Sequence, residues 1–138
     1  MGAFNSRIIS LIGEKSYHKL NGSSVAVIGV GGVVGTAVEA LARSGISKLI
    51  LIDMDVVDES NLNRQVLFLK KDVGSVKVDI AKERIYNINP EIEVIPLKVF
   101  VTPENIDELL YPFHIDFIID AIDAIYSKAA VIEYAVNK

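Results

Sequence analysis

VAVIGVGGVVG, at residues 25–35, is the stretch that determines the fold of this 138-residue chain. It opens with four apolar residues, the pattern of a parallel strand that is buried on both faces. It continues into Gly29, Gly31 and Gly32, where the missing Cβ atoms permit a tight turn and a close approach to a ligand. Because N–H groups at the start of a helix attract anions, the stretch predicts a strand, a phosphate-binding turn and a helix.

A second strand strengthens this interpretation. The dinucleotide-binding fingerprint has a third glycine, and here that position is Val34, with Gly35 one residue later. On its own, such a turn is as compatible with packing as with nucleotide binding. The next apolar strand, 48–53, ends on Asp53, which follows Gly29 by 24 residues, near the spacing of an acid that binds a ribose. The two strands together favour a nucleotide site.

Strand and helix patterns alternate along the rest of the chain. Gly45 is expected to end the helix that starts after the glycine turn, and Thr102 to be the N-cap of a later helix. Alternation of this kind predicts an α/β fold, a Rossmann-like, doubly wound and mostly parallel sheet. Residues 1–23 are expected to form an N-terminal helical arm, and 24–138 a nucleotide-binding domain. The later elements are predicted at 75–88, 93–100, 103–111, 115–120 and 126–136.

Composition narrows the class of protein. Hydrophobic residues make up 51% of the chain, but the apolar runs have the length of strands and are too short to span a bilayer, so no membrane partner is expected. We expect a partner or further chain to cover part of this apolar surface. The net charge of −4 argues against a broadly basic nucleic-acid surface, and the absence of cysteine excludes disulfides and thiolate metal sites. No secretory segment opens the chain, so a cytoplasmic protein is expected.

The segment between the second strand and the helix near 75–88 carries the polar chemistry. Its length is unusual for a crossover, and long loops in compact domains tend to be functional. Arg64 can grip a phosphate through two parallel N–H bonds, while Asn61 and Gln65 supply neutral donors and acceptors beside it. Lys77 is expected in the first turn of a helix, where its charge opposes the helix dipole. That unfavourable position favours a functional role over a solvated surface lysine.

Two acids follow the strand predicted at 115–120. Asp120 and Asp123 are expected just beyond the carboxyl end of that strand, where α/β proteins bind their ligands. Asp123 is a candidate Mg²⁺ ligand, since Mg²⁺ is usually held by one or two carboxylates together with substrate phosphates. The alternative role for either acid is to cap the following helix.

Seven segments, in the same order along nearly the whole chain, resemble the ubiquitin-activating, ThiF/MoeB/HesA superfamily of adenylating enzymes. Within that superfamily, EALARSGI at 39–46, VTPEN at 101–105 and DAIDAIYSKAAVI at 120–132 are most similar to the tRNA threonylcarbamoyladenosine dehydratases. The seven segments are GVGG at 29–32, LARSGI at 41–46, LIDMD at 51–55, SNLNRQ at 60–65, DVGSVK at 72–77, INPEIEV at 88–94 and DAIDA at 120–124.

The resemblance implies a role for each candidate residue. It makes Arg64 and Lys77 phosphate clamps, Asp53 the ribose ligand and Asp123 the Mg²⁺ ligand. The catalytic residues that it implies are Arg64, Lys77, Asp123 and Arg7. It also implies that Arg7, in FNSR, is lent to the ATP site of the neighbouring subunit of a homodimer. The residues implied to bind the nucleotide are Gly29, Gly31, Gly32, Asp53, Asp55, Asn61, Arg64, Gln65 and Lys77.

The implied reaction is adenylation of a carboxylate with ATP and Mg²⁺ as cofactors. In the dehydratases the acid belongs to a modified adenosine of tRNA, and activation ends in ring closure with loss of water. Three alternatives remain open: adenylation of the C-terminus of a sulfur-carrier or ubiquitin-like protein, nucleotide binding without catalysis, and an NAD-dependent oxidoreductase. Because family domains continue with further strands, residues 24–138 are expected to be the N-terminal part of a ThiF-type domain.

Overall fold

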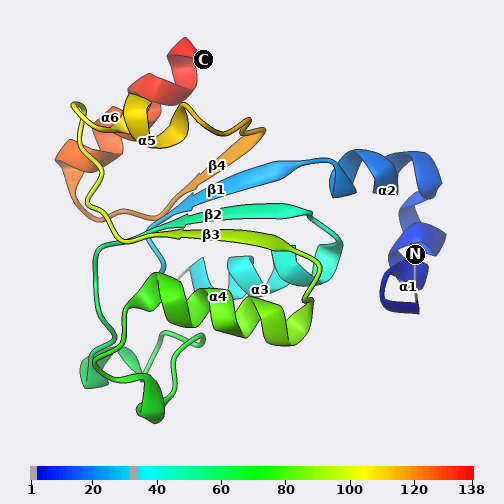
Figure 1. Ribbon diagram of the computed structural model, residues 1–138, viewed down its shortest axis with the longest axis horizontal. Coiled ribbons are helices and arrows are strands. Elements are labelled where there is room, and N and C mark those ends of the chain that lie inside the picture. Colours follow the sequence, from blue (N-terminus) through cyan, green and yellow to red (C-terminus); the bar gives the residue numbers. More distant parts are fainter. Residues whose placement is uncertain (1–2, 32–33) are drawn as a thin grey trace.

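A computed structural model describes residues 3–31 and 34–138 (Figure 1). Its sheet has the strand order β3-β2-β1-β4, and every neighbouring pair is parallel, which confirms the predicted doubly wound α/β fold. The elements are α1 (Ala3–Ile12), α2 (Glu14–Asn21), β1 (Ser24–Ile28), α3 (Val34–Ser44), β2 (Lys48–Ile52), α4 (Lys77–Ile88), β3 (Glu93–Leu97), α5 (Ile106–Leu110), β4 (Phe117–Asp120) and α6 (Ile125–Asn137), with short 3₁₀ turns at Glu59–Asn61 and Lys70–Asp72.

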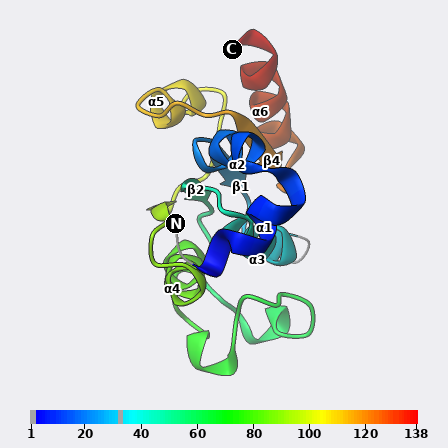
Figure 2. The same ribbon diagram turned by 90° about the vertical axis from the view of Figure 1, so that its right-hand side faces the viewer.

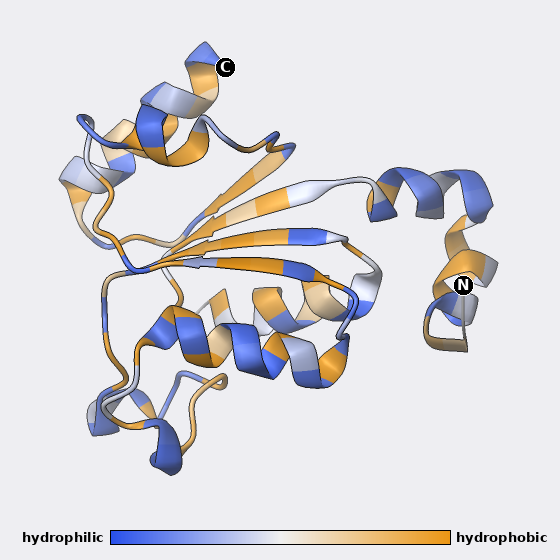
Figure 3. Ribbon diagram, viewed as in Figure 1, coloured by the Kyte–Doolittle hydropathy of each residue, from blue (hydrophilic) through white to orange (hydrophobic). Residues whose placement is uncertain are grey.

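Helices cover both faces of this sheet. Figure 1 shows α3 and α4 on one face and α5 and α6 on the other, and the turned view in Figure 2 keeps the two layers apart. Side chains alternate between the faces along each strand. Val27 and Leu51 therefore belong to the core beneath α3 and α4, whereas Ile28 and Ile52 belong to the core beneath α5 and α6. Figure 3 shows the strands as largely hydrophobic, as expected for a sheet that is covered on both faces.

The order of the strands determines where a ligand site can form. The chain moves outward from β1 through β2 to β3 and then returns to the other side of β1 as β4. A crevice opens where the order reverses, outside the carboxyl ends of β1 and β4. Gly29 lies at this point with φ of +93°, and a Cβ there would lie 2.7 Å from the carbonyl oxygen of Ala121. Only glycine fits, because the turn after β1 passes so close to the segment after β4.

The arm lies at the opposite end of the sheet. Helices α1 and α2 extend beyond the amino ends of the strands (Figure 1), and α2 is largely hydrophilic (Figure 3). Tyr17 is 2% exposed and fixes the arm to the turn after α3, where a Cβ on Gly45 would lie 2.8 Å from its ring. Gly45 has φ of +99° directly after α3, as predicted for the end of that helix. Among the described residues, no helix is both long and apolar enough to cross a bilayer.

Several predicted boundaries were wrong by a few residues. The clearest case is α5, which begins at Ile106 and is preceded by Asn105 rather than by Thr102. The Asn105 side chain accepts a hydrogen bond from the Thr102 backbone N–H at 2.8 Å and donates one to the Phe100 carbonyl at 2.8 Å. These bonds hold residues 100–105 as a turn, so Thr102 does not cap the helix.

Candidate functional site

A cleft of about 1010 Å³ opens at the carboxyl ends of β1, β2 and β4, at the position that the strand order predicts. Its walls are the turn after β1, the crossover from β2 to α4, the apolar segment 99–101 after β3, and the loop from β4 into α6. All predicted site residues in the described part of the chain, apart from Arg7, line it: Gly29, Gly31, Asp53, Asp55, Asn61, Arg64, Gln65, Lys77 and Asp123. Gly32 lies outside the described residues.

The turn after β1 contacts the crossover from β2 to α4. A Cβ on Gly31 would lie 3.5 Å from Nε2 of Gln65, an ordinary van der Waals distance, so the turn and the crossover lie against each other in the wall of the cleft. Val34 lines the cleft as well, although it is only 2% exposed and belongs to the core beneath α3. The close approach expected of a third glycine occurs at Gly35, where a Cβ would lie 3.1 Å from Cγ2 of Val66.

Asp53 joins the two strand ends that form the floor of the cleft. Its Oδ2 accepts a hydrogen bond from the Val30 backbone N–H at 2.8 Å, and its Oδ1 accepts one from the Asp55 N–H at 2.8 Å. The carboxylate therefore fixes the glycine turn to the end of β2. Since an ionised carboxylate has about four acceptor sites, both oxygens can accept a further hydrogen bond from a ligand.

The crossover closes on itself at its base. All three bonds that close it are between backbone groups. The N–H of Val57 donates to the Ser75 carbonyl, and the N–H of Gly74 donates to the Val57 carbonyl. The backbone N–H of Lys77 donates to the Asp55 carbonyl at 3.0 Å. These bonds bring the two ends of the crossover together, so the segment between them is a closed loop beside the cleft. They also place the first residue of α4 next to the end of β2, although the two are far apart in the sequence.

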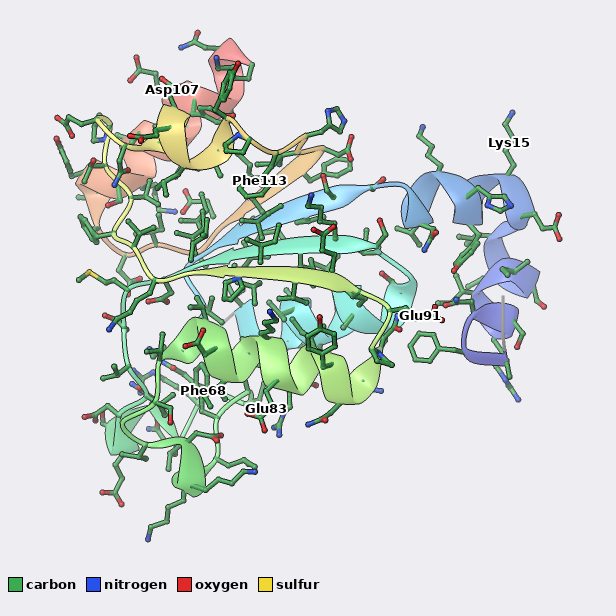
Figure 4. The ribbon with its side chains drawn as sticks, viewed as in Figure 1. Lys15, Phe68, Glu83, Glu91, Asp107 and Phe113 are labelled. Carbon is green, nitrogen blue, oxygen red and sulfur yellow. The ribbon has the colours of Figure 1, made fainter. Side chains whose placement is uncertain are left out.

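Lys77 is the most unusual side chain of the cleft. It is 5% exposed, yet its nearest carboxylate oxygen, Oδ2 of Asp55, is 3.9 Å from its Nζ and belongs to a side chain that is 64% exposed. The Phe68 ring, labelled in Figure 4 near the start of α4, lies 5.8 Å from the same Nζ. Burying an ammonium group is costly unless it is well paired. This arrangement is typical of a cation that is held for an anionic ligand.

The closed loop supplies three more polar side chains. Arg64 donates hydrogen bonds from Nη1 to the Ser60 carbonyl and to Oδ1 of Asn63, each at 3.0 Å. Asn61 accepts a hydrogen bond from the Asp58 N–H through Oδ1, which leaves its amide N–H groups available. Gln65 is 6% exposed, and its Oε1 has no hydrogen-bond partner among the described residues. The loop therefore presents donors and acceptors to the cleft from a fixed backbone.

The loop begins with a capped turn, and this has an electrostatic consequence. Asp58 accepts hydrogen bonds from the Ser60 hydroxyl at 2.6 Å and from the Ser60 backbone N–H at 2.9 Å. These two bonds lower the pKa of the Asp58 carboxyl below its usual value. Asp58 therefore remains ionised at neutral pH and keeps the turn closed.

The two acids after β4 have different surroundings. Asp120 accepts hydrogen bonds from the Ile122 N–H at 3.1 Å and from Nζ of Lys128 at 3.0 Å. Asp123 is exposed in the cleft and has no ion pair within the described part of the chain. The residue that precedes α6 is Ala124, so neither acid caps this helix, contrary to the alternative left open by the sequence.

The chain does not form a metal site of its own in the parts described. Residues 3–31 and 34–138 contain no group of three His, Asp or Glu side chains placed to hold a cation. A Mg²⁺ ion usually needs only one or two carboxylates when substrate phosphates complete its ligands. Asp123 fits that requirement because its carboxylate is exposed to the cleft.

Lys128 is a cleft residue that sequence reasoning missed. It lies in the first turns of α6 and lines the cleft on the β4 side, paired with Asp120. The available signal was a lysine that follows a strand-end acid in the sequence, and it is weak because the two meet only through the loop that joins β4 to α6. The apolar wall at residues 99–101 was missed as well, since the strand predicted there ends earlier, at Leu97.

Arg7 is not part of the cleft of its own chain. It is exposed on α1, in the arm at the amino ends of the strands, whereas the cleft is at their carboxyl ends (Figure 1). The geometry of one chain therefore leaves Arg7 no role in its own site, and the predicted action across a subunit interface stays a prediction.

Comparison with known proteins gives a consistent result. The chain is 49% identical, over 85% of its length, to a tRNA threonylcarbamoyladenosine dehydratase of Bacillus subtilis, and covers 46% of that protein. It is 34% identical, over 94% of its length, to a sulfur carrier protein adenylyltransferase of Thermus thermophilus, and covers 47% of that relative. The chain thus spans about half the length of these curated relatives.

A solved structure and a family match agree with these relatives. The crystal structure of E. coli tRNA N6-threonylcarbamoyladenosine dehydratase, TcdA, in complex with ATP matches the fold with a TM-score of 0.91 at 41% identity. The match covers 96% of this chain and 54% of that one. The ThiF family matches residues 4–138. With the glycine turn, the strand-end acids and the lysine of α4 gathered in one cleft, the chain belongs to the ThiF family.

Proposed function

We propose that this protein adenylates a carboxylate with ATP and that its substrate is the threonylcarbamoyladenosine of tRNA, which it closes to a ring with loss of water. The observation that carries the proposal is the amine of Lys77, which is buried in the cleft at the start of α4 and has its nearest carboxylate oxygen, on the exposed side chain of Asp55, at 3.9 Å. The phosphates of ATP would supply a close negative partner for this amine.

The phosphates of ATP would lie between the glycine turn and the closed loop. Lys77 and Arg64 bring two positive charges to that side of the cleft, and Gln65 and Asn61 add neutral groups. Cations held near the α-phosphate stabilise the negative charge that develops there in the transition state. Asp53, at the end of β2, is placed to accept hydrogen bonds from the ribose hydroxyls.

The charges that line the cleft support binding of the nucleotide together with a cation. Four aspartates face three cationic side chains, so the described lining does not neutralise a triphosphate by itself. Asp123 would hold Mg²⁺ jointly with the phosphates. That ion would supply Lewis-acid stabilisation of the phosphate charge.

The chemistry proceeds in two steps. A carboxylate oxygen of the substrate attacks the α-phosphorus, the bond to pyrophosphate breaks, and an acyl-adenylate forms. A nucleophile within the same modified adenosine then attacks the activated carbonyl carbon and releases its proton, a ring closes and AMP leaves with the former carboxylate oxygen. The net loss is one water, and no oxidant or reductant is needed.

Two comparisons favour tRNA as the substrate over a carrier protein. The dehydratase of B. subtilis is 49% identical to this chain, whereas the sulfur carrier protein adenylyltransferase of T. thermophilus is 34% identical. The ATP complex of the E. coli dehydratase also shares the fold at a TM-score of 0.91. Adenylation of a carrier C-terminus is the second candidate, because it uses the same first step.

We also propose that the protein acts as a homodimer in which Arg7 reaches the cleft of the neighbouring subunit. Arg7 is exposed on an arm that lies away from the cleft of its own chain. The arm also exposes apolar side chains, with Leu11 85% and Phe4 47% exposed, which suits an interface. Two-fold symmetry would complete both sites in the same way.

The experiment that tests the function compares the two candidate substrates, each of which carries a carboxylate. The purified protein is mixed with ATP, Mg²⁺ and either tRNA carrying threonylcarbamoyladenosine or a sulfur-carrier protein, and pyrophosphate release is followed. Stimulation by the modified tRNA, together with formation of the cyclic nucleoside, is the expected result. If only the carrier protein stimulates pyrophosphate release, the carrier and not the tRNA is the substrate. If neither the tRNA nor the carrier protein stimulates release, the proposed adenylation is wrong.

A further inference from the structure

The ion pair between Lys128 and Asp120 is the part of the cleft to which neither the nucleotide nor Mg²⁺ has been assigned. Nζ of Lys128 lies 3.0 Å from Oδ2 of Asp120, and the side chains are 42% and 18% exposed. Both residues line the cleft. The pair joins the end of β4 to the first turns of α6, on the side opposite the crossover that carries Lys77.

Stability is a weak explanation for this pair. The Lys128 side chain is 42% exposed, so solvent screens its charge and the pair makes at most a modest contribution to folding. A lysine near the start of a helix also opposes the helix dipole, and α6 has no side-chain cap that would compensate. Lys128 is thus held at an unfavourable position, and it is held facing the cleft.

Lys128 has hydrogen-bond donors that Asp120 does not use. An ammonium group carries three N–H donors, and one of them is used by Asp120. Asp120 in turn has both oxygens occupied, since Oδ1 accepts the Ile122 N–H. The pair can therefore take up an anion through Lys128 without releasing Asp120.

The proposed reaction favours a cation on this side. Adenylation brings a carboxylate up to a phosphate, so two anions must approach each other. Arg64 and Lys77 belong to the crossover, where the phosphates are proposed to lie. Of the cationic side chains that line the cleft in the described residues, Lys128 is the one contributed by the β4 and α6 side.

We propose that Lys128 binds the carboxylate of the acid substrate and brings it to the α-phosphate, with Asp120 as the positioning residue that orients the lysine. This inference rests on the proposed adenylation and assigns its acid-binding subsite. The carboxylate oxygens accept hydrogen bonds from Nζ, and the charge of Lys128 offsets the repulsion between carboxylate and phosphate.

Lys128→Met tests the proposal because methionine keeps most of the length of lysine and removes the charge. We expect KM for the modified tRNA to rise at least about tenfold, the factor for one charge-assisted hydrogen bond, in pyrophosphate release. The affinity for ATP and Mg²⁺, measured by calorimetry without tRNA, should stay within about twofold, as expected for a residue that does not touch the phosphates. Lys128→Arg should restore part of the lost affinity for tRNA, since it keeps the charge.

Two further variants separate positioning from general damage. Asp120→Asn should raise KM for the tRNA and leave KM for ATP unchanged, which a loss of folded protein cannot mimic. Lys138→Met is the matched control, because Lys138 closes the same helix and lies 3.9 Å from Asp107, in an ion pair outside the cleft. Its KM values should equal those of the parent protein.

The failures are distinguishable. If the parent protein releases pyrophosphate with the tRNA and Lys128→Met keeps KM for that tRNA within twofold, the acid subsite is wrong and the adenylation stands. If Lys128→Met weakens ATP binding as much as it weakens tRNA use, Lys128 is a phosphate ligand instead. If the parent protein activates no acid, both the proposed function and this inference fail.

Discussion

At the scale of single residues, Gly29 shows how strictly the turn after β1 is constrained. Its φ of +93° disfavours any side chain, and a Cβ would overlap the Ala121 carbonyl at 2.7 Å. We predict that Gly29→Ala lowers the free energy of unfolding by more than about 2 kcal/mol, because strain and overlap add. Urea denaturation measures this change.

Gly13 provides the control for that substitution. It has a similar φ of +84°, but a Cβ there would meet nothing within 4 Å. With a ψ of 159°, Gly13 is in a region that glycine alone readily adopts, so Gly13→Ala should cost the backbone strain alone, about 1–3 kcal/mol, and less than Gly29→Ala. Equal losses in the two variants would show that the contact between the turn and the segment after β4 does not constrain the fold.

Substitution of Lys77 should lower activity without lowering stability. Its amine is buried, with the nearest carboxylate oxygen at 3.9 Å, so Lys77→Met removes a charge that is costly to bury. We predict that the melting temperature is unchanged or raised, while tRNA-dependent pyrophosphate release falls at least about 100-fold, the loss typical of one charged transition-state donor. Activity close to that of the parent would mean that the phosphates bind elsewhere.

At the scale of elements, the turn before α5 shows that a sequence with a high propensity to start a helix can form a turn instead. The sequence TPE at 102–104 is a good helix start, yet the side chain of Asn105 closes residues 100–105 into a turn. We predict that Asn105→Ala lowers the free energy of unfolding by about 1–2 kcal/mol, since both of its hydrogen bonds are lost. Thr102→Ala should lower it less, and thermal melts of the two variants decide between the two roles.

The same scale shows how far sequence reasoning reaches. The buried strands β1 and β2, Gly45 and the acid of Asp53 were predictable because their signals are local. Boundaries such as that of α5 depend on side-chain bonds that propensity does not contain. The depth of Lys77 and the pairing of Lys128 with Asp120 were not predictable, because each depends on the meeting of segments that the fold brings together.

At the scale of the whole molecule, the separation of Arg7 from the cleft leads to a test of the proposed dimer. Arg7→Ala and Asp123→Ala should each be inactive alone, because one lacks the borrowed arginine and the other the Mg²⁺ ligand. Mixed together, they should regain part of the activity in tRNA-dependent pyrophosphate release, since one site of each heterodimer has both residues. If subunits are shown to exchange and the mixture stays inactive, Arg7 does not act across an interface.

The central claim is that the cleft at the carboxyl ends of β1, β2 and β4 is an ATP site, and calorimetric titration of the chain with ATP and Mg²⁺, and separately with NAD, tests it most directly. We predict saturable binding of ATP with Mg²⁺, at least about tenfold weaker in Lys77→Met as one charge-assisted bond is lost, and no comparable binding of NAD. Tighter binding of NAD, or an ATP affinity that Lys77→Met leaves unchanged, would contradict the account.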